Sequence, residues 1–213
     1  MSERRLPVYL LLDTSGSMKG EPIQSVNVGL HSMVNALRQD PYALESVYLG
    51  LITFDIDAKE IFPLTPLDEV QIPEIQVPNS GPTFLGAALE LLIQRSDQEI
   101  IKSTPNQKGD WRPLLFIMTD GSPSDLQTFR DMIPELKKRN FGNIVACAAG
   151  PKAKIEVLKE LTDTVVHLDT TDSATFSQFF KWVSASVAAG SSSAGVTEPT
   201  NLPPPPVEVQ VVI

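Results

Sequence analysis

Short apolar runs alternate with amphipathic segments along most of this 213-residue chain. The apolar runs have the length of buried strands and span residues 6–13, 47–54, 113–119, 143–149 and 164–168. Between them, apolar residues recur at steps of three and four, the spacing of helices that bury one face. Strands that alternate with such helices are joined by right-handed crossovers into a mostly parallel sheet. We therefore expect an α/β fold with a doubly wound central sheet and helices on both faces.

The helical stripes and one further strand complete this pattern. The stripes predict helices over residues 22–37, 85–93, 126–136, 152–161 and 176–187. Residues 59–65 are expected to pair back on the strand at 47–54 as a hairpin, and Pro63 cannot donate to a strand ladder, so this strand should be the one antiparallel edge strand. Ser124 and Gln127 match a capping box that would open the third of these helices.

The composition changes after residue 188. Residues 190–195 are rich in Gly and Ser, as in a flexible linker, and residues 203–206 are four consecutive prolines, which favour a stiff polyproline II segment. Residues 207–211 alternate like a strand. We expect one domain over 1–188 and a Gly/Ser/Pro-rich tail over 189–213. The tail is either disordered or docked through a C-terminal strand, on this chain or on a neighbouring one.

Charge and cysteine content restrict the partners and the compartment. The formal net charge is -9 and the pI is near 4.7, which argues against a nucleic-acid or membrane partner because both attract positive charge. No stretch approaches the roughly 20 apolar residues of a membrane helix, and the first apolar run ends at Asp13, too early for a signal peptide. The single cysteine, Cys147, cannot form an intrachain disulfide, and its apolar surroundings predict a buried packing role. We expect a cytoplasmic protein.

Oxygen-bearing side chains gather at the predicted carboxyl edge of the sheet. The run Asp13-Thr-Ser-Gly-Ser17 places a carboxylate and the hydroxyls of Ser15 and Ser17 after the first strand. Asp120 follows the strand at 113–119, and Thr83 precedes a helix in the run from Ser80 to Phe84. In a doubly wound sheet, ligands bind at this edge. Two carboxylates, three hydroxyls and water make an octahedral oxygen site for Mg²⁺ or Mn²⁺, and suit zinc, copper or iron poorly.

These motifs together resemble the metal-ion-dependent adhesion site of von Willebrand factor A (vWA) domains. The likeness rests on D-x-S-x-S after the first strand, a Thr in a G-x-T context and T-D-G after the fourth strand, and it covers roughly residues 6–188. It implies a Rossmann-like fold and an intact site in which Ser15, Ser17 and Thr83 coordinate through hydroxyls, and Asp13 and Asp120 directly or through water. It also implies a protein partner whose Asp or Glu completes the shell. The chain further resembles the bacterial TerY-type branch, which is associated with tellurium and chemical-stress resistance.

Other interpretations of the same residues stay open. An Asp followed by Ser and Gly is often only a cap and turn, and Asp55 and Asp57 are either turn residues or indirect support for the metal. A metal-dependent hydrolase or phosphotransferase is the competing class, but Ser15 stands where the haloacid-dehalogenase loop needs a second Asp, and the loops of this edge contain no His to act as a base. A scaffold with an empty site is a third interpretation. The loop before Trp111 is expected at the opposite edge, as a solvated loop or a second contact surface.

Overall fold

The computed structural model describes residues 4–78, 81–192 and 201–212. Within these ranges, seven strands form one sheet in the order β3-β2-β1-β4-β5-β6-β7. The strands are β1 (Leu6–Asp13), β2 (Val47–Phe54), β3 (Ala58–Pro66), β4 (Leu114–Thr119), β5 (Asn143–Ala149), β6 (Val165–Leu168) and β7 (Gln210–Val212). The helices are the short 3₁₀ helix η1 (Gly16–Met18) and α1 (Glu21–Arg38), α2 (Pro41–Ser46), α3 (Leu85–Glu99), α4 (Leu126–Lys137), α5 (Ile155–Leu161) and α6 (Ser173–Ser192).

The strand pairing confirms the predicted fold class. Strands β2, β1, β4, β5 and β6 run parallel to one another, and β3 pairs antiparallel with β2 at one edge, where Pro63 was expected to place it. The opposite edge is also antiparallel, because β7 pairs with β6. Strand order reverses at β1, which lies between β2 and β4. Open sheets of this kind bind ligands at the carboxyl ends of the strands beside such a reversal.

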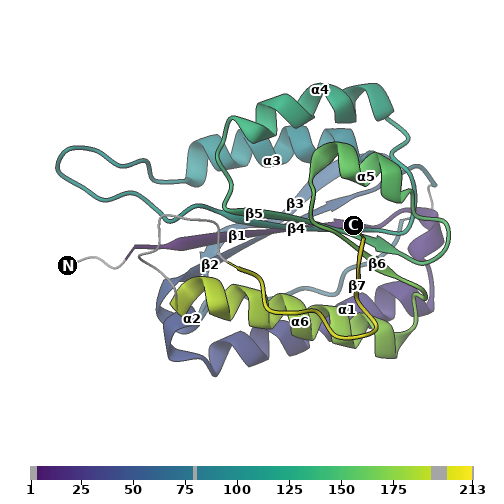
Figure 1. The fold of residues 1–213 in the computed structure, drawn as a ribbon, viewed down its shortest axis with the longest axis horizontal. Helices are drawn as coiled ribbons and strands as arrows, with labels where there is room; N and C mark the ends of the chain where they lie inside the picture. Colours follow the sequence, from purple (N-terminus) through teal and green to yellow (C-terminus); the bar gives the residue numbers. More distant parts are fainter. Residues whose placement is uncertain (1–3, 79–80, 193–200, 213) are drawn as a thin grey trace.

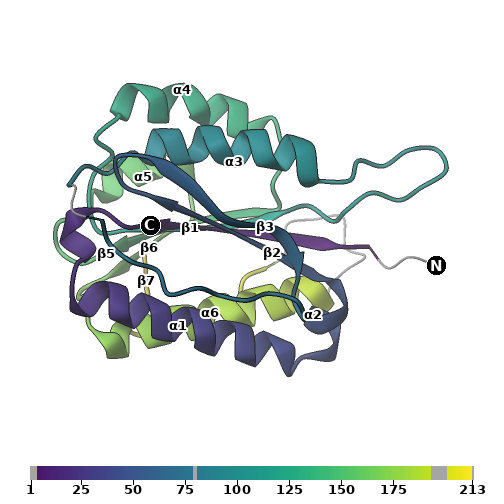
Figure 2. The same ribbon diagram turned by 180° about the vertical axis from the view of Figure 1, so that it is seen from behind.

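Helices cover both faces of the sheet (Figures 1 and 2): α1, α2 and α6 lie on one face and α3, α4 and α5 on the other. The alternation of β1 serves both layers, because Val8, Leu10 and Leu12 join the apolar cluster under α1 and α6, and Tyr9 and Leu11 join the other cluster. Burying one such Leu side chain stabilises the fold by about 1.5–3 kcal/mol. None of the helices in the described ranges combines the length and apolar character needed to cross a membrane.

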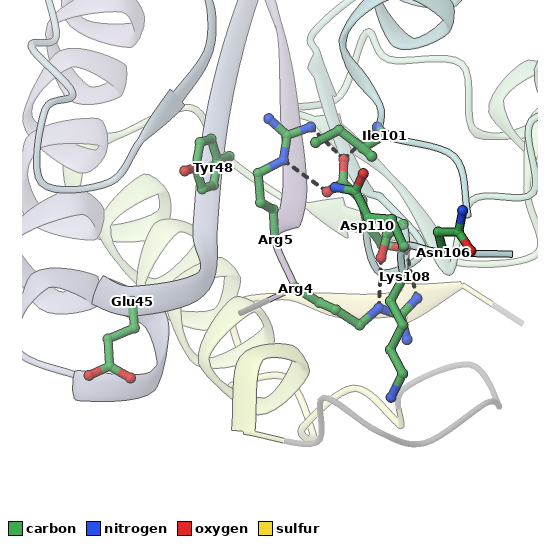
Figure 3. Close-up of a pocket in the computed structure, with 10 residues that line it drawn as sticks. Arg4, Arg5, Glu45, Tyr48, Ile101, Asn106, Lys108 and Asp110 are labelled. Carbon is green, nitrogen blue, oxygen red and sulfur yellow. Dashed lines mark hydrogen bonds and ion pairs between the residues drawn. The ribbon is translucent and has the colours of Figure 1, made fainter. Parts of the chain in front are cut away.

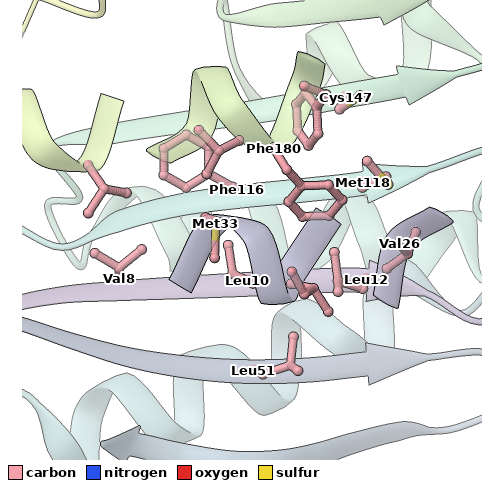
Figure 4. Close-up of a cluster of buried hydrophobic side chains, with 14 of the residues drawn as sticks. Val8, Leu10, Leu12, Val26, Met33, Leu51, Phe116, Met118, Cys147 and Phe180 are labelled. Atoms are coloured by element: carbon pink, nitrogen blue, oxygen red, sulfur yellow. The ribbon is translucent and has the colours of Figure 1, made fainter. Parts of the chain in front are cut away.

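Helices α1 and α6 approach closely over the first cluster (Figure 4). A Cβ atom on Gly29 of α1 would lie 2.1 Å from Cδ2 of Phe180 in α6, so only glycine allows this contact. Cys147 of β5 lies in the same cluster and is fully buried, which confirms its predicted packing role. Burial raises the pKa of its thiol, so the group stays neutral.

The tail beyond residue 188 docks on its own chain. Helix α6 continues to Ser192, past the predicted domain boundary, and β7 then pairs with β6. Between them, the indole Nε1 of Trp182 donates to the carbonyl of Pro203 at 2.8 Å, and the Val209 side chain is buried. Residues 193–195 of the predicted linker lie outside the described residues.

The predicted capping box at the start of α4 is not formed. The N-cap residue is Asp125, and no side chain caps the helix. The Ser124 hydroxyl instead accepts a hydrogen bond from the backbone N–H of Thr83 at 3.0 Å. A contact between distant segments has replaced the local one that the sequence pattern favoured.

Candidate metal centre

The two predicted carboxylates reach one edge of the sheet from adjacent strands. Asp13 is the last residue of β1, and Asp120 directly follows β4. The two strands pair in parallel up to Leu12 and Met118, so the next residues, Asp13 and Thr119, are neighbours. The hydroxyl of Thr119 donates to Oδ2 of Asp13 at 2.6 Å.

The loop after β1 folds its hydroxyls onto these carboxylates. The backbone N–H of Ser15 donates to Oδ1 of Asp13 at 2.7 Å, which turns the chain at the strand end. Helix η1 then carries Ser17, whose Oγ lies 3.3 Å from Oγ of Ser15 and donates to Oδ1 of Asp120 at 2.7 Å. Side-chain oxygens from two loops thus form one cluster. Asp13, Ser15 and Asp120 are buried, whereas Ser17 is exposed and opens the cluster to solvent.

Thr83 reaches the same place from the connection between β3 and α3. Its side chain is buried, and its Oγ1 would lie 3.4 Å from a Cβ atom placed on Gly121, the residue after Asp120. Of the five residues predicted as metal ligands, the structure therefore links Asp13, Ser15, Ser17 and Asp120 by hydrogen bonds and places Thr83 beside them, next to Gly121. Ser80, at the start of the predicted Thr83 loop, lies outside the described residues.

Two further buried residues, Thr119 and Asp55, support this cluster. Thr119 was not singled out, although it lies in the Met-Thr-Asp-Gly run, and it holds Asp13 as described above. Oδ2 of Asp55, which follows β2, accepts from the Thr14 hydroxyl at 3.0 Å, and its backbone carbonyl accepts from the N–H of Phe84 at 2.8 Å. Asp55 therefore joins the loop after β1 to the residue that follows Thr83. Its position at a strand end was the available signal.

Burial disfavours the charged forms of the two carboxylates in the cluster. Burial raises the pKa of Asp13 to about 6; hydrogen bonds from Ser15 and Thr119 oppose this shift, and the charge of Asp120 adds to it. Burial also raises the pKa of Asp120, against the hydrogen bond from Ser17 and the positive charge of the exposed Lys152. A cation bound between the two carboxylates would favour the charged form of both.

The donor set fits a hard divalent cation. The cluster offers carboxylate and hydroxyl oxygens, the ligands that Mg²⁺ and Mn²⁺ prefer. In the described ranges, no group of three or more His, Cys, Asp or Glu side chains is arranged to hold a metal ion. A metal centre built from these residues therefore depends on the serine and threonine hydroxyls as well as on the two aspartates.

The Trp111 loop lies at the amino-terminal ends of the parallel strands, opposite the metal cluster, beside a hollow of about 870 Å³ (Figure 3). Nε of Arg5 donates to Oδ1 of Asp110 at 2.8 Å. Nε of Arg4 donates to the carbonyl of Gly109 at 2.7 Å, and its guanidinium lies 3.6 Å from the centre of the Trp111 ring. Both arginines thus anchor the loop to the start of β1, which accounts for them without a ligand.

Comparisons with known proteins agree on one family and one fold. The family model described as the von Willebrand factor type A domain matches residues 8–181. No curated protein matches the sequence.

One similar solved structure is proximal thread matrix protein 1 from the mussel byssus, whose metal-ion-dependent adhesion site (MIDAS) motif is occupied by zinc. It is 17% identical with a TM-score of 0.63, over 87% of this chain and 48% of that one. A von Willebrand factor type A protein from Catenulispora acidiphila is 15% identical with a TM-score of 0.62, over 87% and 43%. Manganese-loaded TRAP protein from Plasmodium vivax is 19% identical with a TM-score of 0.55, over 84% and 74%. This chain spans about half the length of the mussel protein. At these identities the likeness shows a shared fold.

Proposed function

The chain belongs to the von Willebrand factor type A domain family, and on this premise we propose that it is a metal-dependent protein-binding module. In this proposal, the metal ligands are Asp13, Ser15, Ser17, Thr83 and Asp120. The bound ion supplies a positive charge that an Asp or Glu carboxylate of a partner protein can coordinate.

The convergence of three separate loops on one oxygen cluster carries the proposal. The loops after β1, before α3 and after β4 each contribute at least one side chain. Hydrogen bonds link the Asp13 carboxylate to the N–H of Ser15, the Ser15 hydroxyl to that of Ser17, and the Ser17 hydroxyl to Asp120. Caps and turns would account for each loop separately. They would not account for two buried carboxylates close enough that the charge of Asp120 raises the pKa of Asp13, because burying such charges is unfavourable unless something neutralises them.

Mg²⁺ or Mn²⁺ is the proposed ion. Two similar structures carry metal, zinc in the mussel byssus protein and manganese in the Plasmodium protein, so the fold accepts more than one divalent ion. In this chain the site contains only oxygen donors, and zinc favours nitrogen and sulfur ligands. Hard-ligand chemistry therefore supports Mg²⁺ or Mn²⁺.

The surroundings of the cluster support an acidic partner. The chain carries a formal net charge of -9, which by itself repels acidic proteins. At this edge, however, a divalent ion would add to the charge of Lys152, which lies close enough to Asp120 to lower the pKa of its carboxyl. The exposed Ser17 leaves the cluster open on one side, where a partner carboxylate can approach.

A hydrolase or phosphotransferase remains the alternative, and the site supports it less well. Both oxygens of Asp13 already accept hydrogen bonds, from Ser15 and Thr119, so this carboxylate is held rather than free to attack. The loops of this edge contain no His. We therefore propose a binding role without catalysis.

The cellular setting is also a proposal. The resemblance to the TerY-type branch supports a role in tellurium or chemical-stress resistance, and the acidic composition with its single cysteine supports a cytoplasmic location without nucleic-acid or membrane partners.

Partner capture tests the proposed function. Immobilised protein is exposed to an extract of its native cells in Mg²⁺, and all proteins that it retains are identified and purified. Their affinity is then measured for wild type and for Thr83→Ala, with circular dichroism as the folding control. We expect binding that EDTA abolishes, that Thr83→Ala strongly weakens, and that is lost when one acidic residue of the partner is changed to its amide. Binding that ignores all three changes would show that the partner docks elsewhere.

A further inference from the structure

Thr83 is the one member of the cluster that no neighbouring strand positions. Asp13 and Asp120 stand at the ends of strands, and Ser15 and Ser17 follow within a few residues. Thr83 instead belongs to the long connection between Pro66 and Leu85, whose described residues form no helix or strand. Contacts with other segments must therefore hold it at the carboxyl edge of the sheet.

Ser124 takes both backbone hydrogen-bonding groups of Thr83. The backbone N–H of Ser124 donates to the carbonyl of Thr83 at 2.8 Å, and the N–H of Thr83 donates to Oγ of Ser124 at 3.0 Å. Two bonds at a single residue fix its position and its orientation. Ser124 lies on the same loop as Asp120, so Thr83 is tied to the loop that carries the second carboxylate.

Asp125 extends this link to the first turn of α3. Its Oδ1 accepts from the N–H of Gly86 at 3.0 Å, and its Oδ2 accepts from the N–H of Ala87 at 2.8 Å. The N-cap residue of α3 is Phe84, whose side chain has no oxygen with which to cap the helix. Asp125 therefore supplies from another segment the carboxylate that a helix N-terminus favours.

Gly86 makes this approach sterically possible. A Cβ atom at this position would lie 2.4 Å from the backbone N of Phe129 and 2.7 Å from Oδ2 of Asp125. Any other residue would push α3 away from α4 and would break the contact with Asp125. The sequence thus places a glycine where the two helices must meet.

Neither Ser124 nor Asp125 caps its own helix, although both precede α4 and belong to residue types that favour N-caps. Both side chains are committed to the Thr83 segment instead. Where a local preference of this kind is left unused, the contact that replaces it is often functional. Here the replacing contact leads directly to a predicted metal ligand.

We propose that Ser124 and Asp125 form a clamp that holds Thr83 at the metal centre. Ser124 bonds Thr83 directly, and Asp125 is a positioning residue that acts by fixing the first turn of α3 beside it. The inference rests on the proposed function, because it assigns a role in the same site. The clamp joins the loops of Thr83 and Asp120 into one unit before any ion arrives. The hydroxyl of Thr83 is therefore preorganised, and metal affinity depends on a carboxylate that does not itself touch the metal.

A double-mutant cycle tests the clamp. The Mn²⁺ dissociation constant is measured by electron paramagnetic resonance of the free ion for wild type, Asp125→Ala, Thr83→Ala and the double variant. Asp131→Ala is the matched control, because Asp131 is an exposed carboxylate of α4 that accepts from Gln127, one turn earlier in the same helix. Asp125→Asn keeps one acceptor oxygen and serves if the alanine variant does not fold. Melting temperatures in EDTA are recorded for every variant.

We expect Asp125→Ala to weaken Mn²⁺ binding by about tenfold or more, as is typical for loss of a group that orients a metal ligand. The double variant should bind no more weakly than Thr83→Ala, because Asp125 acts through Thr83. The melting temperature should nevertheless fall on loss of Asp125 in both backgrounds, since the cap on α3 is lost in each. Asp131→Ala should bind as wild type does, and Asp125→Asn should lie between.

Two results would overturn the clamp while leaving the metal centre standing. One is wild-type Mn²⁺ affinity in a folded Asp125 variant whose melting temperature has dropped, which would reduce Asp125 to a stabilising cap. The other is additive losses in the double variant. Failure of the wild-type protein to bind Mn²⁺ would refute the proposed metal centre and the clamp with it.

Discussion

Replacing Asp13 by Asn separates the stability that metal binding would add to the fold from the stability that the buried Asp13 charge costs without metal. Asn has nearly the same shape as Asp but no charge. Its Oδ1 can still accept from the N–H of Ser15, and the Thr119 hydroxyl, which donates to Asp13, can rotate to accept from the new amide. The substitution therefore removes a metal ligand and a buried charge while it preserves the local hydrogen bonds.

The expected magnitude for wild type follows from binding to the folded state alone. Such binding contributes about 2.7 kcal/mol when the free ion exceeds its dissociation constant a hundredfold. For a chain of this length, each kcal/mol raises the melting temperature by roughly 2–4 °C. Saturating Mg²⁺ or Mn²⁺ should therefore raise the melting temperature of wild type by about 5–10 °C relative to EDTA.

The metal-free proteins should differ in the opposite direction. The pKa of Asp13 is raised from 3.8 to about 6, so above pH 6 the charged carboxylate destabilises the folded state by about 3 kcal/mol. The sign follows from the direction of this shift, because the folded protein binds the proton more tightly than the unfolded chain does. Asp13→Asn should consequently melt higher than wild type in EDTA at pH 7.5, and should gain nothing from metal.

Differential scanning calorimetry at pH 7.5, with and without metal, measures both effects. Asp57→Asn is the matched control, because Asp57 is an exposed turn carboxylate at the same edge of the sheet. It should keep the full metal-induced shift. The reasoning fails if wild type shows no shift at millimolar metal, or if Asp13→Asn keeps the shift.

Three further predictions concern pH, partner charge and the tail. The metal-induced rise in melting temperature should shrink as the pH falls from 7.5 to 5, because the raised pKa of Asp13 makes protons compete with the ion; a shift independent of pH would contradict this. Lys152→Glu should weaken capture of an acidic partner in Mg²⁺, whereas Lys108→Glu, an equal charge change at the opposite edge, should not; equal losses would indicate a general charge effect. A chain that ends at Ser192 should bind Mn²⁺ as the full chain does but melt at a lower temperature, because it loses β7 and the buried Val209; loss of Mn²⁺ binding would show that the tail supports the metal loops.

The sheet and the cluster of oxygen-bearing side chains at its carboxyl end could be predicted because their signals are local. Each buried strand is a continuous apolar run, and a polar residue that follows such a run must lie at the carboxyl edge of a parallel sheet. Asp13 and Asp120 were found in this way. The same rule pointed to Asp55, whose buried carboxylate and carbonyl turned out to support the neighbouring loops.

The remaining features depend on contacts between distant segments, which a local pattern does not contain. Ser124 reads as a helix cap, and only the approach of the Thr83 segment gives its hydroxyl another partner. Helix α6 runs beyond residue 188, where Gly190 and Ser191 are buried and Gly190 packs near Leu114 and Leu6 of the sheet. The alternation in the tail indicated a strand, but the partner of β7 is the open edge of β6, which the tail sequence does not identify.

A crystal structure with Mn²⁺, measured at a wavelength where manganese scatters anomalously, tests the central claim most directly. The signal identifies the ion and locates it without any assumption about its ligands. We predict one strong peak in contact with oxygens of the Asp13–Ser17 loop, beside Thr83 and Asp120 at the carboxyl edge of β1 and β4. The account is contradicted if crystals grown in saturating Mn²⁺ show no peak there, or if the only peak lies elsewhere, for example beside His167 and Asp169.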